Sequence, residues 1–156
     1  MSTVDGRRIR EFQAESLQRH AIEFGEWMVR ASNNRAHALG HKELRPAHAR
    51  LMVFLDWEGS RISDIAKAQD VSKNAVGQLV TELEDLGYVE RVPDPADGRA
   101  KIVRYTDQGR ALLADASAIA EQLDAEIEAI VGAKRLAALR STLADICHHL
   151  ELGPAS

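Results

Sequence analysis

The sequence is poor in several residue types, and each scarcity removes a class of protein. It contains one cysteine, Cys147, which excludes an intrachain disulfide framework and a cysteine-rich zinc site. No run of about 18 apolar residues occurs, so we expect no membrane span. The first residues, MSTVDGRRIREFQAES, carry charges but lack the apolar core of a secretory signal. These absences predict a cytoplasmic location.

Motifs for catalysis and metal binding are also missing. The chain has no glycine-rich phosphate loop, no HExxH and no nucleophile motif, so we expect no enzyme and no cofactor. His37 and His41 lie four residues apart, with Glu43 and His48 nearby, and this spacing on one helix suits zinc. Gly40 and its loop-like surroundings argue against a continuous helix there, so no metal is predicted.

What remains is a helix-forming composition in a chain of single-domain length. The 156 residues suit one domain with a helical extension, and 45% hydrophobic residues can fill a core. Alanine and leucine are abundant and aromatic residues make up 4%, which favours helices. The net charge of −4 argues against a nonspecific nucleic-acid binder, but residues 91–104 hold four basic residues against two acidic ones. A polyanion would therefore meet local basic patches.

Periodicity and end signals divide the chain into helices and one hairpin. We predict a long helix over residues 7–33 and a break marked by Asn33, Asn34 and Gly40. Short helices are expected from 46 to about 59 and over 62–69. The next helix begins after Ser72 and ends at Gly87, where N-cap and C-terminal glycine signals stand. Two strands, YVERV and KIVRY, precede a helix from Thr106 to about 131 and a last helix after Gly132.

This order predicts a mainly α protein with a small β-hairpin. Three short helices followed by a two-stranded hairpin are typical of a winged helix-turn-helix domain. We assign residues 46–105 to this DNA-binding lobe, and residues 1–45 and 106–156 to a helical dimerisation region.

The helix that follows Ser72 has one apolar and one polar face. Val76, Leu79, Val80 and Leu83 can pack inward, while Asn and Gln side chains outside offer the donor and acceptor pair that binds adenine. Glycine in a helix interior costs about 1 kcal/mol relative to alanine, which suggests close approach to a groove. A solvated face with an incidental glycine is the alternative. The predicted DNA contacts on this helix are Ser72, Lys73, Asn74, Gly77, Gln78 and Thr81.

The stretch DPADGRAK, residues 94–101, is predicted to be a projecting loop too long for a two-residue turn. Gly98 would turn the backbone beside Arg99, and Arg99 with Lys101 would touch the DNA backbone or minor groove. Asp94 or Asp97 would orient the Arg99 guanidinium. Asp97, Arg99 and Lys101 are therefore the predicted wing contacts. The alternative is an ordinary surface hairpin of mixed charge.

From Leu44 to Leu113 the sequence resembles the MarR family of bacterial transcription regulators, most clearly in VSKNAVGQLVTELEDLGYVERVPDPADGRAK and YTDQGRALL. The D-x-R element of the family wing matches Asp97 to Arg99, with Gly98 where members often have a second arginine. Gly77 likewise stands where many members have Ser or Thr. The resemblance implies a homodimer whose recognition helices enter successive major grooves of double-stranded DNA and whose wings reach adjacent minor grooves.

Two apolar stripes support the implied dimer. They recur at helical spacing near the end of the chain and need a covering surface, although an intrachain helical hairpin could supply part of it. Two-fold symmetry then predicts a near-palindromic operator with half-sites about 10 bp apart. The stripes consist of Leu112, Ala116, Ile119, Leu123, Ile127 and Ile130, and of Leu136, Leu139, Leu143, Ile146 and Leu150.

The resemblance also implies a small aromatic or anionic effector between the dimerisation region and the DNA-binding lobe. Among the candidate lining residues, Trp27, Met52 and Phe54 could equally be plain core. Arg30 and His48 could be solvated. Cys147 follows Ile146 on the apolar side of its helix, so we expect a buried, inert thiol rather than a redox sensor. The candidate lining residues are Trp27, Arg30, His48, Met52 and Phe54.

Taken together, the sequence predicts a homodimeric repressor that binds a DNA operator and is released by a small ligand. A winged-helix adaptor that contacts another protein, without specific DNA binding, is the competing interpretation. The low overall basicity of the chain is its best support.

Overall fold

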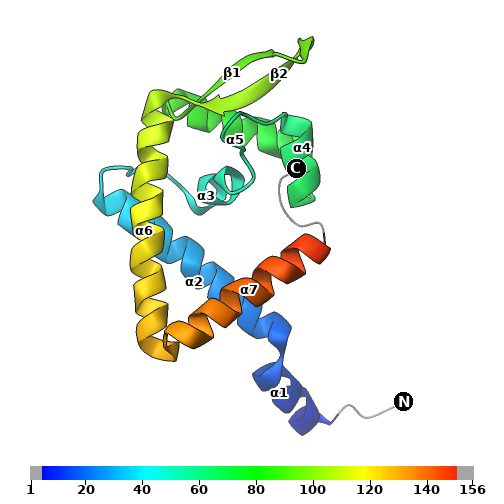
Figure 1. Ribbon diagram of the computed structural model, residues 1–156. Coiled ribbons are helices and arrows are strands. Elements are labelled where there is room, and N and C mark those ends of the chain that lie inside the picture. The colour runs from blue at the N-terminus through cyan, green and yellow to red at the C-terminus, as the bar shows by residue number, and fades with distance from the viewer. Residues whose placement is uncertain (1–4, 151–156) are drawn as a thin grey trace.

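A two-stranded hairpin and three short helices form one end of the molecule, and long helices extend from it (Figure 1). The computed structural model describes residues 5–150. Two strands pair antiparallel within this part of the chain. The elements in chain order are α1 (Gly6–Glu15), α2 (Leu17–Ala38), α3 (Pro46–Met52), α4 (Ile62–Gln69), α5 (Lys73–Asp85), β1 (Val89–Asp94), β2 (Asp97–Tyr105), α6 (Asp107–Val131) and α7 (Ala133–His149).

The mainly helical fold with one hairpin is the predicted winged helix-turn-helix arrangement. Its core forms where α5 packs against α3, α4 and the hairpin. Val76, Val80 and Leu83 of α5 are fully buried, which confirms the predicted inward face of this helix. Val103 of β2 exchanges backbone hydrogen bonds with Ser60. The segment before α4 therefore pairs with the hairpin through a single antiparallel β-bridge.

Most helix ends in the second half of the chain follow the local signals. The Ser72 hydroxyl accepts a hydrogen bond from the Ala75 backbone N–H at 3.1 Å, and the Thr106 hydroxyl accepts one from Gly109 at 3.0 Å. Gly87 follows α5 with φ of +80°, a conformation that favours glycine. Gly132 has φ of +83° between α6 and α7. The four predicted boundaries are confirmed.

The prediction for the first half of the chain was wrong in two places. The expected single helix over residues 7–33 is split at Ser16, whose hydroxyl caps α2 by accepting from the Arg19 N–H. The expected break occurs at Gly40, which has φ of +104°, and not at Asn33 and Asn34. Helix α2 continues to Ala38, and the Asn33 amide contacts His37 one turn later. A polar residue that bonds within the helix does not end it. The third helix ends at Met52, earlier than expected.

The hairpin also differs from its prediction. Asp94 of β1 pairs with Asp97 of β2, so only Pro95 and Ala96 connect the strands. The register is irregular because Pro93 pairs with Lys101, which leaves residues 98–100 as an insertion in β2. The turn closes because the Asp94 carboxylate accepts from the Ala96 N–H at 2.8 Å. Gly98 has no positive φ, so its expected role in turning the backbone is not needed.

The long helices carry the remaining apolar surface. α6 packs on α2, and α7 packs on α6. Leu112, Ile119 and Leu123 of α6 are buried within the chain, but on α7 only Leu136 is buried. Cys147 is exposed, which contradicts the expected buried thiol, because every residue of α7 other than Leu136 is left exposed by the described part of the chain. No described helix is long and apolar enough to cross a membrane.

The replacement Gly77→Ala is expected to raise the free energy of unfolding by about 0.5–1 kcal/mol, since alanine restricts the unfolded chain and favours the helix. A Cβ at Gly77 would meet no atom within 4 Å, so no clash opposes this gain. Urea unfolding followed by circular dichroism measures it. Gly109→Ala is the control and should destabilise, because its Cβ would lie 1.9 Å from the Tyr88 carbonyl oxygen. No gain for Gly77→Ala would contradict the prediction.

Candidate nucleic-acid interface

The outer face of α5 presents a row of exposed polar groups. Ser72 and Lys73 are exposed at its N-terminal end, and Asn74 and Gln78 are exposed one turn apart. Neither amide forms a side-chain hydrogen bond with another described residue. Gly77 lies between them beside open space. A flat surface with free amide donors and acceptors is suited to base edges in a major groove.

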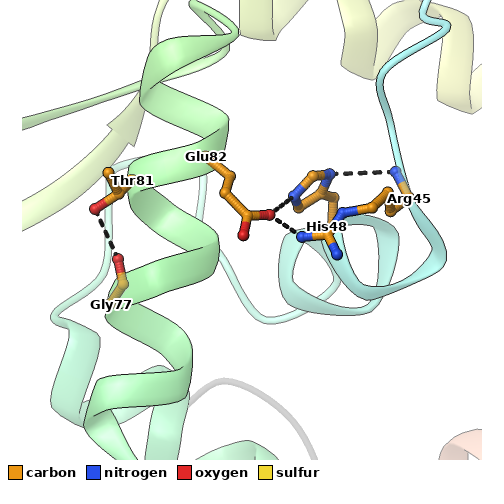
Figure 2. A network of polar contacts seen from close by, with 5 residues as sticks. All are labelled: Arg45, His48, Gly77, Thr81 and Glu82. Carbon is orange, nitrogen blue, oxygen red and sulfur yellow. Dashed lines mark hydrogen bonds and ion pairs between the residues drawn. The ribbon is translucent and has the colours of Figure 1, made fainter.

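Thr81 belongs to the same face, but its hydroxyl is already engaged. It donates to the Gly77 carbonyl at 3.0 Å, as Figure 2 shows, and accepts from Nη2 of Arg91 at 3.0 Å. A hydroxyl has one proton to donate. Thr81 is therefore less free than Asn74 and Gln78 to donate to a base.

On another side of α5, Glu82 ties the helix to the start of α3 (Figure 2). Its carboxylate accepts from Nε2 of His48 at 2.8 Å and pairs with the Arg45 guanidinium. The Arg45 backbone N–H donates to Nδ1 of His48 at 3.2 Å, which fixes the neutral Nε2–H form of the imidazole. Burial and the nearby Arg45 charge both lower the pKa of His48. Glu82 is thus neutralised away from the candidate interface.

The hairpin tip carries two exposed cations, Arg99 and Lys101. Among the described residues, neither has an acidic partner within ion-pair distance. Asp97 accepts from the backbone N–H of Arg99 at 3.1 Å, so it bonds the Arg99 backbone. The free guanidinium of Arg99 is available to a phosphate or a minor-groove edge.

Asp94 does not orient Arg99, contrary to the prediction. Its carboxylate instead accepts from Nε of Arg61 at 2.6 Å, which anchors the hairpin turn to the start of α4. The Ala96 N–H and then Arg61 hold the pKa of Asp94 below its ordinary value. Asp97 lies 3.9 Å from Nη2 of the same arginine. Sequence reasoning missed Arg61, since nothing local links two residues 33 positions apart.

Arg91 was also missed, although it joins the hairpin to α5. Its guanidinium donates to the Gly77 carbonyl and to Thr81, and pairs with Glu84. The only sequence signal was a charged residue within the strand-like run YVERV. These contacts place β1 beside the exposed face of α5, so the helix and the wing form one continuous surface.

The two histidines considered for metal have other partners. His37 lies in α2 with Nε2 at 2.6 Å from the Leu44 carbonyl oxygen. His41 lies between the Tyr88 hydroxyl, at 2.8 Å, and the Asp115 carboxylate, at 2.9 Å. These contacts connect the loop after α2 to the base of the wing and to α6. Within residues 5–150, no three potential metal-ligating side chains gather.

A cavity of about 830 Å³ lies between α2, α3, the end of α4 and α6. Met52 and Phe54 are in its wall, whereas Trp27, Arg30 and His48 are not. Trp27 stacks on Phe24, and His48 is buried against Glu82. The wall consists of Met28, Val29, Ser32, Asn33, Ala36, Leu44, Ala49, Arg50, Met52, Val53, Phe54, Ala68, Gln69, Val71, Leu112, Leu113, Ala116 and Ile119.

The winged lobe matches a protein-family model and parts of curated proteins. Residues 43–100 match the model of the MarR family. The chain is 31% identical to the HTH-type transcriptional regulator BilQ of Clostridioides difficile over 67 residues, which are 43% of this chain and 45% of that protein. It spans about half the length of the curated relatives it matches.

Solved structures share the fold over most of the chain. CouR from Rhodococcus jostii, bound to p-coumaroyl-CoA, aligns with a TM-score of 0.68 and 25% identity over 85% of this chain and 92% of that one. A mutant MarR from E. coli complexed with operator DNA aligns with a TM-score of 0.67 and 21% identity over 86% of this chain and 96% of that one. The winged lobe thus matches the MarR family, and most of the chain shares the fold of solved MarR-type structures.

Proposed function

We propose that this protein is a transcriptional regulator that binds a specific site in double-stranded DNA. The observation that carries the proposal is the exposed face of α5. There the amides of Asn74 and Gln78 lie beside Gly77, near the wing cations, and none of these side chains is paired with another residue in the range 5–150. In a major groove, each amide can bind an adenine edge through a donor and an acceptor. Lys73 at the start of α5 is placed for a phosphate.

The distribution of charge supports this role in an acidic protein. The acids nearest the interface are internally paired, Glu82 with His48 and Arg45, and Glu84 with Arg91. Arg99 and Lys101 at the wing tip are unpaired among the described residues. The surface that would face DNA is therefore locally positive despite the net charge of −4.

The protein would act as a homodimer. The single chain leaves apolar surface on its long helices and on α1 that needs a partner. Five apolar side chains there are at least 42% exposed: Ile9 and Phe12 of α1, Ile130 of α6, and Leu143 and Ile146 of α7. The resemblance to the MarR family implies a second copy of the chain as that partner. Two copies related by two-fold symmetry would bind a near-palindromic operator.

Repression relieved by a small ligand completes the proposal. The cavity lies between the long helices and the lobe that carries α5, so an occupant would contact both. Its wall is mostly apolar, and its one charged residue, Arg50, is paired with Glu26 at 2.6 Å. This lining favours an aromatic body over a multiply charged one. The relative CouR, whose structure holds p-coumaroyl-CoA, supplies a probe.

The competing function is a winged-helix adaptor that binds another protein, which the net negative charge favours. The dependence of binding affinity on salt concentration separates the two interpretations. DNA binding that neutralises phosphates releases counterions and weakens steeply as salt rises. An affinity that does not change with salt would support the adaptor.

The variant Gln78→Ala is expected to weaken binding by about 1–3 kcal/mol and to relax the preference at one base step, because a bidentate base contact is lost. Arg99→Ala should weaken binding to all sites nearly alike, or mainly to sites with A·T-rich flanks. Fluorescence anisotropy on a duplex selected from a random pool measures both. Lys42→Ala, an exposed cation in the loop after α2, is the control. Wild-type affinity in both variants would show that the interface is misassigned.

The variant Leu143→Glu is expected to convert the dimer to monomer, because a carboxylate would be buried in an apolar interface. Light scattering after size-exclusion chromatography gives the mass. Ser141→Glu introduces the same charge at an exposed position of the same helix and should leave the dimer intact if it lies outside the interface. A monomeric wild-type protein would refute the proposed dimer.

The variant Ala116→Phe is expected to fill part of the cavity and abolish ligand binding. With p-coumarate, the aromatic acyl part of p-coumaroyl-CoA, as probe, wild-type protein should show a higher Tm and release DNA. Ala111→Phe, on the same helix but outside the cavity wall, should respond as wild type. An equal response from both variants would place the ligand elsewhere. Thermal shift and anisotropy supply the two measurements.

A further inference from the structure

Arg91 connects the wing to the recognition helix through several contacts at once. It lies on β1 opposite Val103, and its side chain is 25% exposed. Nη2 donates to the Gly77 carbonyl and to the Thr81 hydroxyl, each at 3.0 Å, and Nη1 pairs with Glu84. Its backbone N–H also donates to Glu84 at 2.9 Å. One residue of the hairpin thus holds three positions of α5.

These positions follow one line along the helix. Residues 77, 81 and 84 are spaced by four and three, so they lie on one face over two turns. A planar guanidinium can bond to several acceptors arranged in this way, whereas a lysine ammonium on a flexible stem cannot reproduce the same fork. The contacts therefore constrain both the distance and the angle between β1 and α5.

The charge of Arg91 is used within the protein. Glu84 would otherwise present an unpaired carboxylate near the surface proposed to face phosphates. The ion pair neutralises both groups, so Arg91 adds little net charge to the interface. By contrast, Arg99 and Lys101 on β2 lack acidic partners among the described residues and are free to contact DNA.

We propose that Arg91 is a positioning residue that sets the wing at a fixed distance and angle to α5. DNA presents the major groove to Asn74 and Gln78 and the adjacent minor groove to Arg99, so both contacts require this geometry at the same time. Thr81 takes part in these contacts with Arg91 and is not one of the base-reading residues. The inference rests on the proposed function, because DNA is the ligand that needs both elements aligned.

The first experiment needs no DNA. Arg91→Lys is compared with Arg104→Lys, whose arginine pairs with Glu90 at 2.9 Å across the same hairpin without touching α5. Hydrogen–deuterium exchange should be faster in residues 89–105 of Arg91→Lys and unchanged in Arg104→Lys. Thr81→Val, which removes one acceptor, should give a smaller increase in exchange. Equal exchange in Arg91→Lys and Arg104→Lys would show that Arg91 does not fix the wing to α5.

The second experiment uses a duplex that wild-type protein selects from a random pool. Arg91→Lys should bind it roughly 10- to 100-fold more weakly, the scale of one or two misplaced base contacts. Discrimination should fall at the Gln78 step and in the wing flanks together, while the slope of log affinity against log salt stays the same. Arg104→Lys should retain both preferences.

A direct phosphate contact by Arg91 would give a different pattern. Arg91→Ala would then weaken binding to all sequences alike and reduce the salt slope by about one, and that result would overturn the positioning role. If wild-type protein selects no duplex, the proposed DNA-binding function fails. The exchange measurement still decides whether Arg91 holds the wing to α5, so the two failures are distinguishable.

Discussion

Burial of one face of α5 is the constraint on which the interface depends. Val76, Val80 and Leu83 are fully enclosed by the lobe, so this helix cannot rotate without exposing them to water. Because the inward face is fixed, the outward face is fixed as well, and Asn74, Gly77 and Gln78 must project from the molecule. The apolar core thus determines which polar groups are available to a partner.

Charged groups then refine the position of this helix. Glu82 holds one side of α5 to α3 through His48 and Arg45, and Glu84 holds another side to the hairpin through Arg91. Arg61 holds the hairpin turn through Asp94. Each pair combines a cation and an acid from different elements, so the acids are neutralised where they also serve as anchors. An acidic chain can in this way present a locally basic surface.

The same molecule leaves its long helices incompletely covered. α6 buries Ile119 and Leu123 against its own chain, whereas α7 leaves Leu143 and Ile146 exposed. A cavity lies where the long helices meet the lobe, with walls from α2 and α6 on one side and from α3 on the other. The polar contacts of His41 with Tyr88 and Asp115 cross the same junction. Changes in the long helices therefore have physical routes to the lobe that carries α5.

The sequence by itself determined the features that depend on neighbours within a few residues. Caps at Ser72 and Thr106, chain reversal at Gly87 and the two faces of α5 follow from local hydrogen bonds, glycine conformation and helical spacing. Only the tertiary structure decided which cations are free: Arg61 and Arg91 are bound to acids, while Arg99 and Lys101 are not paired within the described residues. It also decided that the hairpin turn is short, because the Asp94 carboxylate that closes it is held by Arg61, 33 residues earlier. Pairings across such distances depend on how elements pack, and no local pattern records them.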